Sequence, residues 1–378
     1  MSIQCPACGA ANPDHSWQCA CGHYFVTTMP KTPGSAEAAG DTSAGADFAS
    51  SQQSQFQGQP PNEVKNWRLV FRGQGDALFG IYIVNLLLTL LTLGIYYFWG
   101  KVKVRNYTYS QTEFEGDRFA YHGTGKELLI GWLKAILILG LLLGLFFAIV
   151  AAAPGAAELL SNLYSALFYM VLLPIAIVGS RRYRLSRTSW RGIRFSFRGH
   201  AEALINIFVR DSILTGLTLG IYYPYFQNHL RKFLVSNVYF GNRGFDYDGE
   251  GGDLWRIYAV GIFFTICTLG VYYFWFSASK ARYYWERTTF SGSRGLSTVT
   301  GWNLAKLKIG NLLLIVFTLG LGYPWTVVRS LRFDMDNIHF YGSLDLNVIQ
   351  QEAMAASATG EGFTEMLDAG MLDIDLGF

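Results

Sequence analysis

Long apolar runs separated by short polar segments fill the middle of the chain. Five of these runs, each about 20 residues long, cover 77–99, 128–150, 202–226, 255–276 and 303–327. At a rise of about 1.5 Å per residue, a helix of this length crosses a hydrocarbon layer of about 30 Å. The pattern therefore predicts an α-helical integral membrane protein.

The runs belong to a repeated unit that opens with an aromatic residue, any residue and a glycine. The openings are Phe71–Gly73, Tyr121–Gly123, Phe197–Gly199, Tyr247–Gly249 and the variant Val299–Gly301, and a sixth, Phe340–Gly342, closes the series. A second glycine follows 21 residues after the first in four copies and 19 after it in the last, and in every copy but the second it ends the string Thr-Leu-Gly. We expect about five internal repeats, with units near 71–120, 121–196, 197–246, 247–298 and 299–346.

Each run continues into aromatic residues, then basic residues, then an alternating segment. The aromatic residues, such as Tyr96 and Trp99, suit the boundary between lipid and water. Basic residues such as Lys101 and Arg105 follow them. The segment 238–247 alternates apolar and polar residues around a glycine turn, which is typical of two short strands. Each unit is therefore expected to be a membrane helix or hairpin followed by a short cytoplasmic β-hairpin.

The charge of the polar segments indicates how the apolar runs are threaded. The segment 180–200 holds seven arginines and no acidic residue, so the positive-inside rule places it in the cytoplasm. Simple alternation of six spans, counting 163–179, would place it outside. The conflict disappears if each unit is a hairpin that starts and ends on the cytoplasmic side, full length around 153–155 in the second unit and shortened, re-entrant or interfacial, in the others. The repeated domain, 65–350, is then multi-pass, with both chain termini in the cytoplasm.

Charge is distributed unevenly along the chain. Residues 66–350 hold 28 Lys and Arg against 16 Asp and Glu, whereas the tail 351–378 has six acidic residues and no basic one. Basic loops are typical of the cytoplasmic face of a membrane protein, so we expect the lipid bilayer, and no nucleic acid, as a partner. The tail alternates acidic and large apolar residues, which is typical either of a docking segment or of a solvated, disordered end.

Four of the five cysteines lie in two short pairs near the N-terminus. The pairs are Cys5 with Cys8 and Cys19 with Cys21, each followed by a glycine. Such pairs supply the four tetrahedral ligands of a structural Zn²⁺, and His15 or His23 is an alternative ligand. We expect a zinc-ribbon-like knuckle over 1–25 in a reducing compartment, and a disordered linker over 26–64.

Residues 71–346 resemble the YjgN-like family of bacterial inner-membrane proteins, whose domain has no known function. The resemblance is carried by strings such as Thr92-Leu-Gly-Ile-Tyr-Tyr-Phe-Trp99, by the basic segments after them and by the Phe-x-Gly turns. It implies a location in the bacterial cytoplasmic membrane and brings no activity with it. The second unit departs from the pattern, because it has lost Thr-Leu and gained an insert.

Two adjacent charged residues, Arg210 and Asp211, lie near the middle of the run 202–226. Ionisable groups inside a membrane mark functional sites or buried ion pairs. Neighbours on a helix point about 100° apart, so each of the two is expected to pair with a different helix. Asn85 and Asn311 are expected to form hydrogen bonds between units. These polar positions are the strongest candidates for a site within the membrane.

The sequence holds no catalytic signature: a Gly-x-Ser-x-Gly string, a phosphate-binding loop and a paired-histidine metal motif are all absent. We therefore expect a non-enzymatic membrane platform or channel-like assembly, whose knuckle and tail recruit a cytoplasmic protein partner. A homo-oligomer is compatible with this hypothesis. The alternative is a transporter with a substrate site between repeats that involves Arg210 and Asp211.

Overall fold

A computed structural model describes residues 2–4, 11–13, 65–344, 346 and 349 of the chain. The chain divides into two compact regions, 1–60 and 61–378. In the first region, β1 (Ser2–Gln4) pairs antiparallel with β2 (Ala11–Pro13). The expected zinc ligands Cys5, Cys8, Cys19 and Cys21, the linker and the acidic tail lie outside the described residues.

In the second region, five helical hairpins are separated by pairs of short strands. Hairpins one, three, four and five are α2 (Gly75–Leu91) with α3 (Tyr97–Ser110), α7 (Ala201–Leu217) with α8 (Tyr223–Ser236), α9 (Gly251–Cys267) with α10 (Tyr273–Glu286), and α11 (Gly301–Phe317) with α12 (Tyr323–Asn337). Hairpin two is longer. It runs from α4 (Gly125–Ala152) through a 3₁₀ turn (Pro154–Ala156) to α5 (Ala157–Leu167), a π-helical turn (Phe168–Leu172) and α6 (Leu173–Ser186).

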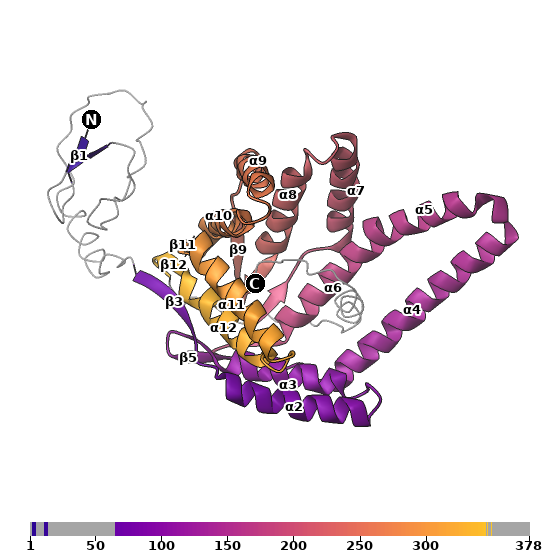
Figure 1. The fold of residues 1–378 in the computed structure, drawn as a ribbon, viewed down its shortest axis with the longest axis horizontal. Helices are drawn as coiled ribbons and strands as arrows, with labels where there is room; N and C mark the ends of the chain where they lie inside the picture. Colours follow the sequence, from indigo (N-terminus) through magenta and orange to yellow (C-terminus); the bar gives the residue numbers. More distant parts are fainter. Residues whose placement is uncertain (1, 5–10, 14–64, 345, 347–348, 350–378) are drawn as a thin grey trace, which may run out of the picture. The chain divides into compact units, whose positions relative to one another are not determined.

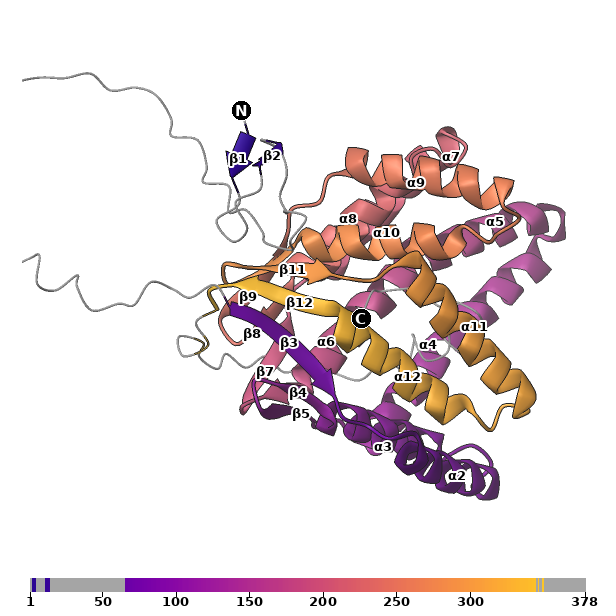
Figure 2. The ribbon, with the colours of Figure 1, turned by 60° about the vertical axis from the view of Figure 1, so that its left-hand side comes forward.

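The ten strands of this region form one closed antiparallel barrel. Four of its strand pairs are β4 (Thr112–Phe114) with β5 (Asp117–Tyr121), β6 (Thr188–Trp190) with β7 (Ile193–Phe197), β8 (Val238–Phe240) with β9 (Arg243–Tyr247), and β10 (Thr288–Phe290) with β11 (Ser293–Ser297). The fifth pair joins β3 (Lys65–Phe71) to β12 (Ile338–Gly342), which contains the sixth aromatic-x-glycine opening. The helices fan out from the strands (Figure 2). The short strands expected at the end of each unit are thus parts of a single barrel.

Aromatic side chains fill the inside of this barrel. One apolar cluster contains described side chains from every strand except β11, and side chains on all sides of a closed barrel meet only through its interior. Neighbouring rings are in contact: the ring centroid of Trp190 lies 5.3 Å from that of Phe114 and 5.8 Å from that of Phe240. Leu344 and Ile349, which follow β12, belong to the same cluster. The barrel is therefore a packed core.

A left-handed turn closes four of the hairpins at the Thr-Leu-Gly string. In hairpin one, Leu93 and Gly94 have φ angles of 51° and 94°, and the Gly94 N–H donates to the Thr89 carbonyl at 2.7 Å. This bonding ends a helix by satisfying one of its last carbonyl groups. The Thr92 hydroxyl accepts from the Tyr96 N–H at 2.9 Å and so caps the start of the next helix.

These turns correct the length of the predicted spans. The runs 77–99, 202–226, 255–276 and 303–327 each contain a turn, so the prediction that each is one membrane-crossing helix is wrong. The reason is local, because the apolar pattern continues through the turn while the backbone reverses. The alternative prediction, that each unit is a helical hairpin, agrees with the helices observed.

Hairpin two lacks the left-handed turn. Helix α4 continues past Gly144 to Ala152, and the chain reverses around Pro154. By length and composition, Gly125–Ala152 and Pro154–Ser186 are the two helices of the described part of the chain that could cross a membrane. Figure 1 shows α4 and α5 extending beyond the other helices. The full-length hairpin predicted around 153–155 agrees with this arrangement.

The opening glycines lie where an aromatic ring two residues earlier covers the chain. A Cβ atom on Gly73 would overlap the Phe71 ring, and one on Gly249 would overlap the Tyr247 ring. Each ring ends a barrel strand and is buried. Glycine is therefore required at this position for the chain to leave the barrel and enter the helix.

The opening of unit five has a different register from the predicted one. Helix α11 begins at Gly301, as α2 begins at Gly75, so the residue that corresponds to the opening glycine is Val299. Ser297 replaces the aromatic residue and leaves room for the Val299 side chain. The predicted alignment of Val299–Gly301 is thus wrong by two residues, and the corrected spacing from 299 to Gly320 is 21 residues, as in the other units.

Neighbouring hairpins pack through an aromatic residue at the start of the second helix. A Cβ atom on Gly125, the first residue of α4, would lie 2.6 Å from the Trp99 ring of hairpin one. Gly75 is covered in the same way by Trp325 of hairpin five, whose indole N–H donates to Asp76 at 3.0 Å. The aromatic residues predicted for the lipid–water boundary therefore also hold adjacent hairpins together and close the ring from α12 to α2.

Candidate functional site

The residue ten positions after the start of each hairpin's first helix is buried. Asn85 in α2 donates to the Gly100 carbonyl of α3 at 3.1 Å, and Asn311 in α11 donates to the Ser330 hydroxyl of α12 at 3.1 Å. Asp211 takes this position in α7. Asp211 therefore lies where two other hairpins use a neutral amide to join their two helices.

Asp211 is completely buried, and two side chains bind its two carboxylate oxygens. Arg210 Nε donates to Oδ1 at 2.7 Å, and His229 Nδ1, from α8, lies 2.7 Å from Oδ2. The side chain of Asp211 is 0% exposed, whereas that of Arg210 is 57% exposed. Burial of a carboxylate is costly unless hydrogen-bonding partners of this kind surround it. The three side chains therefore form one ion-paired cluster between α7 and α8.

A single nitrogen of His229 faces both charged groups. Arg210 Nη2 lies 3.1 Å from the same Nδ1 that contacts Asp211. Arginine can only donate, so Nδ1 cannot accept from Arg210 while its own N–H donates to Asp211. A hydrogen bond to a carboxylate is the stronger of the two, which favours the tautomer with the proton on Nδ1. The cluster thus joins a carboxylate of α7 to an imidazole of α8 through one hydrogen bond.

The structure changes how the predicted polar residues pair. The prediction that Arg210 and Asp211 pair across helices agrees with their contacts to His229 of α8. The prediction that they do not share a partner is wrong, because the long Arg210 side chain bends back to Asp211 and reaches the same histidine. Asn85 and Asn311 bond within their own hairpins, not between units, because the second helix of the hairpin packs on that face. His229 does not stand out in the sequence. The feature that identifies His229 is its position opposite Asp211. This position can be recognised only after α7 and α8 are aligned.

Arginines at the barrel ends of three helices bind the backbone of the next unit. Arg182 donates to the Gly199 carbonyl at 2.8 Å, Arg282 to the Val299 carbonyl at 2.7 Å, and Arg332 to the Gly73 carbonyl at 3.0 Å. All three arginines lie six residues before the following strand. Part of the positive charge that predicts a cytoplasmic face therefore also holds the ring of hairpins together.

Two ionisable groups on the barrel have shifted pKa values. The hydrogen bond from Arg72 lowers the pKa of Glu113 below its usual range. Burial lowers the pKa of His339, and the charge of Arg68, opposite it on β3, adds to this effect. A charged neighbour therefore explains the shift of Glu113, and burial in the barrel is the main cause of the shift of His339.

In the part of the chain that the structure describes, no group of three or more His, Cys, Asp and Glu side chains could hold a metal ion. The predicted zinc ligands, Cys5, Cys8, Cys19 and Cys21, lie outside that part. The zinc knuckle therefore stays a prediction from the sequence.

Two curated relatives are inner membrane proteins by name. Inner membrane protein YjgN of Escherichia coli (strain K12) is 34% identical over 135 residues, which are 36% of this chain and 32% of the relative. Inner membrane protein YjgN of Salmonella typhimurium (strain LT2) is 37% identical over 133 residues, which are 35% of this chain and 32% of the relative. The chain thus matches about a third of the length of these relatives. No solved structure matches it.

A family described as bacterial protein of unknown function (DUF898) matches residues 66–264, 244–294 and 291–366. The matched residues include all five hairpins and the ten barrel strands except Lys65, the first residue of β3. The chain therefore belongs to this bacterial family of unknown function.

Proposed function

We propose that the chain is a non-enzymatic scaffold of the bacterial inner membrane. Its curated relatives are inner membrane proteins, and hairpin two has two helices of membrane-spanning length and composition. In this proposal, hairpin two crosses the bilayer and the four short hairpins enter the nearer leaflet from the barrel side. Every hairpin begins and ends at a barrel strand, so the barrel lies on one side of the bilayer. The seven arginines of 180–200 assign that side, with both chain termini, to the cytoplasm in this proposal.

The tips of the short hairpins support insertion into lipid. The left-handed residues Leu93, Leu219, Leu269 and Leu319 are between 93% and 96% exposed. A left-handed conformation costs a leucine about 1–2 kcal/mol, and an exposed leucine in water gains nothing that offsets this cost. Burial of the same side chain in hydrocarbon contributes about 1.5–3 kcal/mol. Leucine at this position is therefore favourable in lipid.

The packed interior of the barrel is the observation that favours a scaffold over a channel. A solute that moved along the barrel axis would have to displace the cluster that contains Phe114, Trp190, Phe240 and Phe290. Close-packed aromatic side chains resist such displacement because each buries a large apolar area. A rigid, closed base beneath five hairpins suits a protein that holds partners at a membrane.

Flux and labelling measurements test this proposal. Sealed vesicles that contain the full-length protein are expected to release potassium ions and a small fluorescent dye no faster than vesicles without protein. The labelling test uses a chain in which Cys267→Ser removes the cysteine of α9. Asn242→Cys then places a new cysteine in the turn between β8 and β9. It is expected to react with an impermeant maleimide only after the cells are opened. Protein-dependent flux, or labelling of this cysteine in intact cells, would refute the proposal.

One observation favours a second candidate, a transporter with a site at Arg210, Asp211 and His229. Asp211 is a fully buried carboxylate at a position where Asn85 and Asn311 are neutral. If the cluster is structural, Asp211→Ala costs about 1–3 kcal/mol of folding stability, because it removes the carboxylate that binds Arg210 and His229, and Asp211→Asn leaves solute flux unchanged. An Asp211→Asn protein that assembles normally but alters solute flux would instead support transport.

Partner recruitment through the N-terminal knuckle completes the proposal. We assign one structural Zn²⁺ to Cys5, Cys8, Cys19 and Cys21, and the acidic tail 351–378 acts as a second docking segment. Elemental analysis of the purified chain is expected to find one zinc per molecule, and Cys19→Ser is expected to lose it. Wild-type protein that contains no zinc after growth in zinc-replete medium would refute the assignment.

A further inference from the structure

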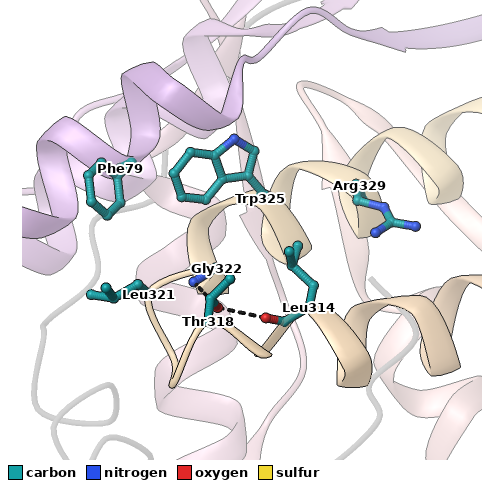
Figure 3. A pocket seen from close by; sticks show the side chains of 7 residues that line it. All are labelled: Phe79, Leu314, Thr318, Leu321, Gly322, Trp325 and Arg329. Carbon is teal, nitrogen blue, oxygen red and sulfur yellow. Dashed lines mark hydrogen bonds between the residues drawn. The ribbon is translucent and has the colours of Figure 1, made fainter. Parts of the chain in front are cut away.

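An apolar groove opens between hairpin five and hairpin one. It has a volume of about 610 Å³ and is lined by Phe79, Leu314, Thr318, Leu321, Gly322, Trp325 and Arg329. Figure 3 shows the Phe79 ring of α2 beside the Trp325 ring of α12, with the turn from Thr318 to Gly322 next to them. The two ring centroids are 5.0 Å apart. Arg329 is the one charged residue among those that line the groove.

One aromatic residue of the repeat is missing beside the groove. Three residues before Trp99, Tyr225 and Trp275, the other hairpins carry Tyr96, Tyr222 and Tyr272. Each tyrosine stacks on the later ring, with interplanar angles of 18°, 19° and 15°. Gly322 takes the corresponding place beside Trp325. The face of the Trp325 indole that a tyrosine would cover is therefore left open to the groove.

The charge beside the groove is also particular to hairpin five. Arg329 extends over α11 at Gly310, where an added Cβ atom would lie 3.1 Å from its Nη2. In hairpin three, Asp211 neutralises the nearby arginine, but hairpin five has the neutral Asn311 at that position. Within the described residues, no carboxylate forms an ion pair with Arg329. An external anion would therefore supply the missing negative charge.

Arg329 lies at the depth of lipid phosphates if hairpin five is inserted to its tip. Six residues separate it from Tyr323, the first residue of α12, which is about 9 Å along a helix. Half of the hydrocarbon layer is about 15 Å, and an arginine side chain reaches the remaining distance toward the headgroups. An acyl chain in the groove would then extend from Arg329 toward the exposed Leu319 at the tip.

We propose that the groove binds one phospholipid of the surrounding bilayer, with an acyl chain between Phe79, Leu321 and Trp325 and its phosphate on Arg329. The apolar lining matches the chain, and the guanidinium donates charge-assisted hydrogen bonds to phosphate oxygens. The lipid would fill the gap at the seam where the last hairpin packs against the first. This inference rests on the proposed insertion of the hairpins, but lipid binding in detergent is measured independently of topology.

Native mass spectrometry of the full-length protein in detergent tests the proposal. The protein is titrated with dioleoylphosphatidylglycerol, or with dioleoylglycerol, which has the same chains but no phosphate. Wild-type protein is expected to hold one phosphatidylglycerol at least about tenfold more tightly than the diacylglycerol. Arg329→Ser should remove this preference, whereas Lys103→Ser, at the same position in hairpin one, should keep it because Tyr96 already fills that groove.

A second variant tests the groove itself. Gly322→Tyr introduces the residue that three other hairpins carry. A Cβ atom at this position would lie 2.6 Å from Thr318 Oγ1 and 2.8 Å from Leu314 Cγ, so both side chains must shift to admit it. The folded variant is expected to reduce binding of both lipids at least about tenfold. If Gly322→Tyr does not fold, Arg329→Ser still decides, because its exposed side chain can be replaced without changing the core. Equal affinity of wild type for the two lipids, a preference that survives Arg329→Ser, or undiminished binding by folded Gly322→Tyr would overturn the proposal.

The acidic tail is the alternative occupant of the groove. The test uses a full-length chain with Cys267→Ser, Leu321→Cys in the groove and Leu367→Cys in the tail. A disulfide between the two new cysteines, in place of lipid binding, would show that the tail occupies the groove. That result would overturn the lipid proposal. Neither result depends on which side of the membrane the barrel faces, so failure of the lipid proposal and failure of the scaffold proposal are separate outcomes.

Discussion

Hairpins two and three leave and rejoin the barrel in the same way, but they extend to different distances. Each starts after a barrel strand, β5 or β7, and each returns to the next strand, β6 or β8. Helix α4 has 28 residues and α7 has 17, which correspond to about 42 and about 26 Å at 1.5 Å per residue. The Thr-Leu-Gly string at 218–220 ends α7, whereas Leu-Leu-Gly at 142–144 lies inside α4.

The short hairpin ends at a local turn that the long hairpin lacks. The Thr218 hydroxyl donates to the Leu214 carbonyl at 2.7 Å and accepts from the Tyr222 N–H at 3.0 Å, so one side chain ends one helix and starts the next. Leu142 can form neither bond. The barrel imposes the same start on both hairpins, and the presence or absence of this threonine accompanies the difference between a short hairpin and one of membrane-spanning length.

The largest expected effect is a difference in access to the two tips. In a chain with Cys267→Ser, Gly155→Cys in hairpin two should react with an impermeant maleimide in intact cells at least about tenfold more than Leu219→Cys in hairpin three, because hydrocarbon excludes the reagent. The mass shift of the labelled protein measures this difference. Equal labelling of the two cysteines would mean that the short hairpins cross the membrane as well.

The barrel ends of long and short hairpins should respond alike to substitution. Gly123→Ala, before hairpin two, and Gly249→Ala, before hairpin four, each force a Cβ atom into a tyrosine ring, and each should cost about 1–3 kcal/mol of unfolding free energy. Unfolding in detergent, followed by circular dichroism, measures the loss. As a control, Tyr247→Ser should relieve Gly249→Ala, as Ser297 does beside Val299. A large cost before only one of the two hairpins would break the comparison.

Removal of the turn threonine should weaken only a short hairpin. Thr218→Val keeps the shape of the side chain but removes both hydrogen bonds at the tip of hairpin three, with an expected loss of about 1–2 kcal/mol. The matched change, Leu142→Thr, installs the string in hairpin two. It should change stability by less than about 0.5 kcal/mol, because threonine is only slightly worse than leucine inside a helix. A larger effect of Leu142→Thr would show that the string alone can end α4.

The smallest expected effect is a change in stability at the tip of hairpin three. The sign of this change shows whether the tip lies in lipid or in water. Leu219→Gly relieves about 1–2 kcal/mol of left-handed strain but removes a side chain worth about 1.5–3 kcal/mol if it is buried in lipid. In lipid nanodiscs the variant should therefore be less stable than wild type by about 1 kcal/mol. Thermal unfolding in nanodiscs decides, and a gain in stability would place the tip in water.

Local sequence patterns were sufficient to predict the hairpins. They were not sufficient to predict which distant strands pair. The arginines of 180–200 and strings such as 218–220 can each be recognised from a short stretch of sequence. The barrel closes through β3 and β12, where Trp67 donates to the Gly342 carbonyl across 275 residues, and nothing in either strand identifies its partner. The register error at Val299 has a similar cause, because Ser297 makes a glycine unnecessary only once the two side chains are known to meet.

The pairing of β3 with β12 has a consequence for synthesis on the ribosome. Strand β3 emerges before all other barrel strands, and its partner β12 emerges after them, so the sheet keeps two open edges until β12 has been synthesised. Open edges can pair with another chain and promote aggregation. A ribosome that stalls before Ile338 would therefore release a product that quality-control proteases can recognise, and not a partly working protein.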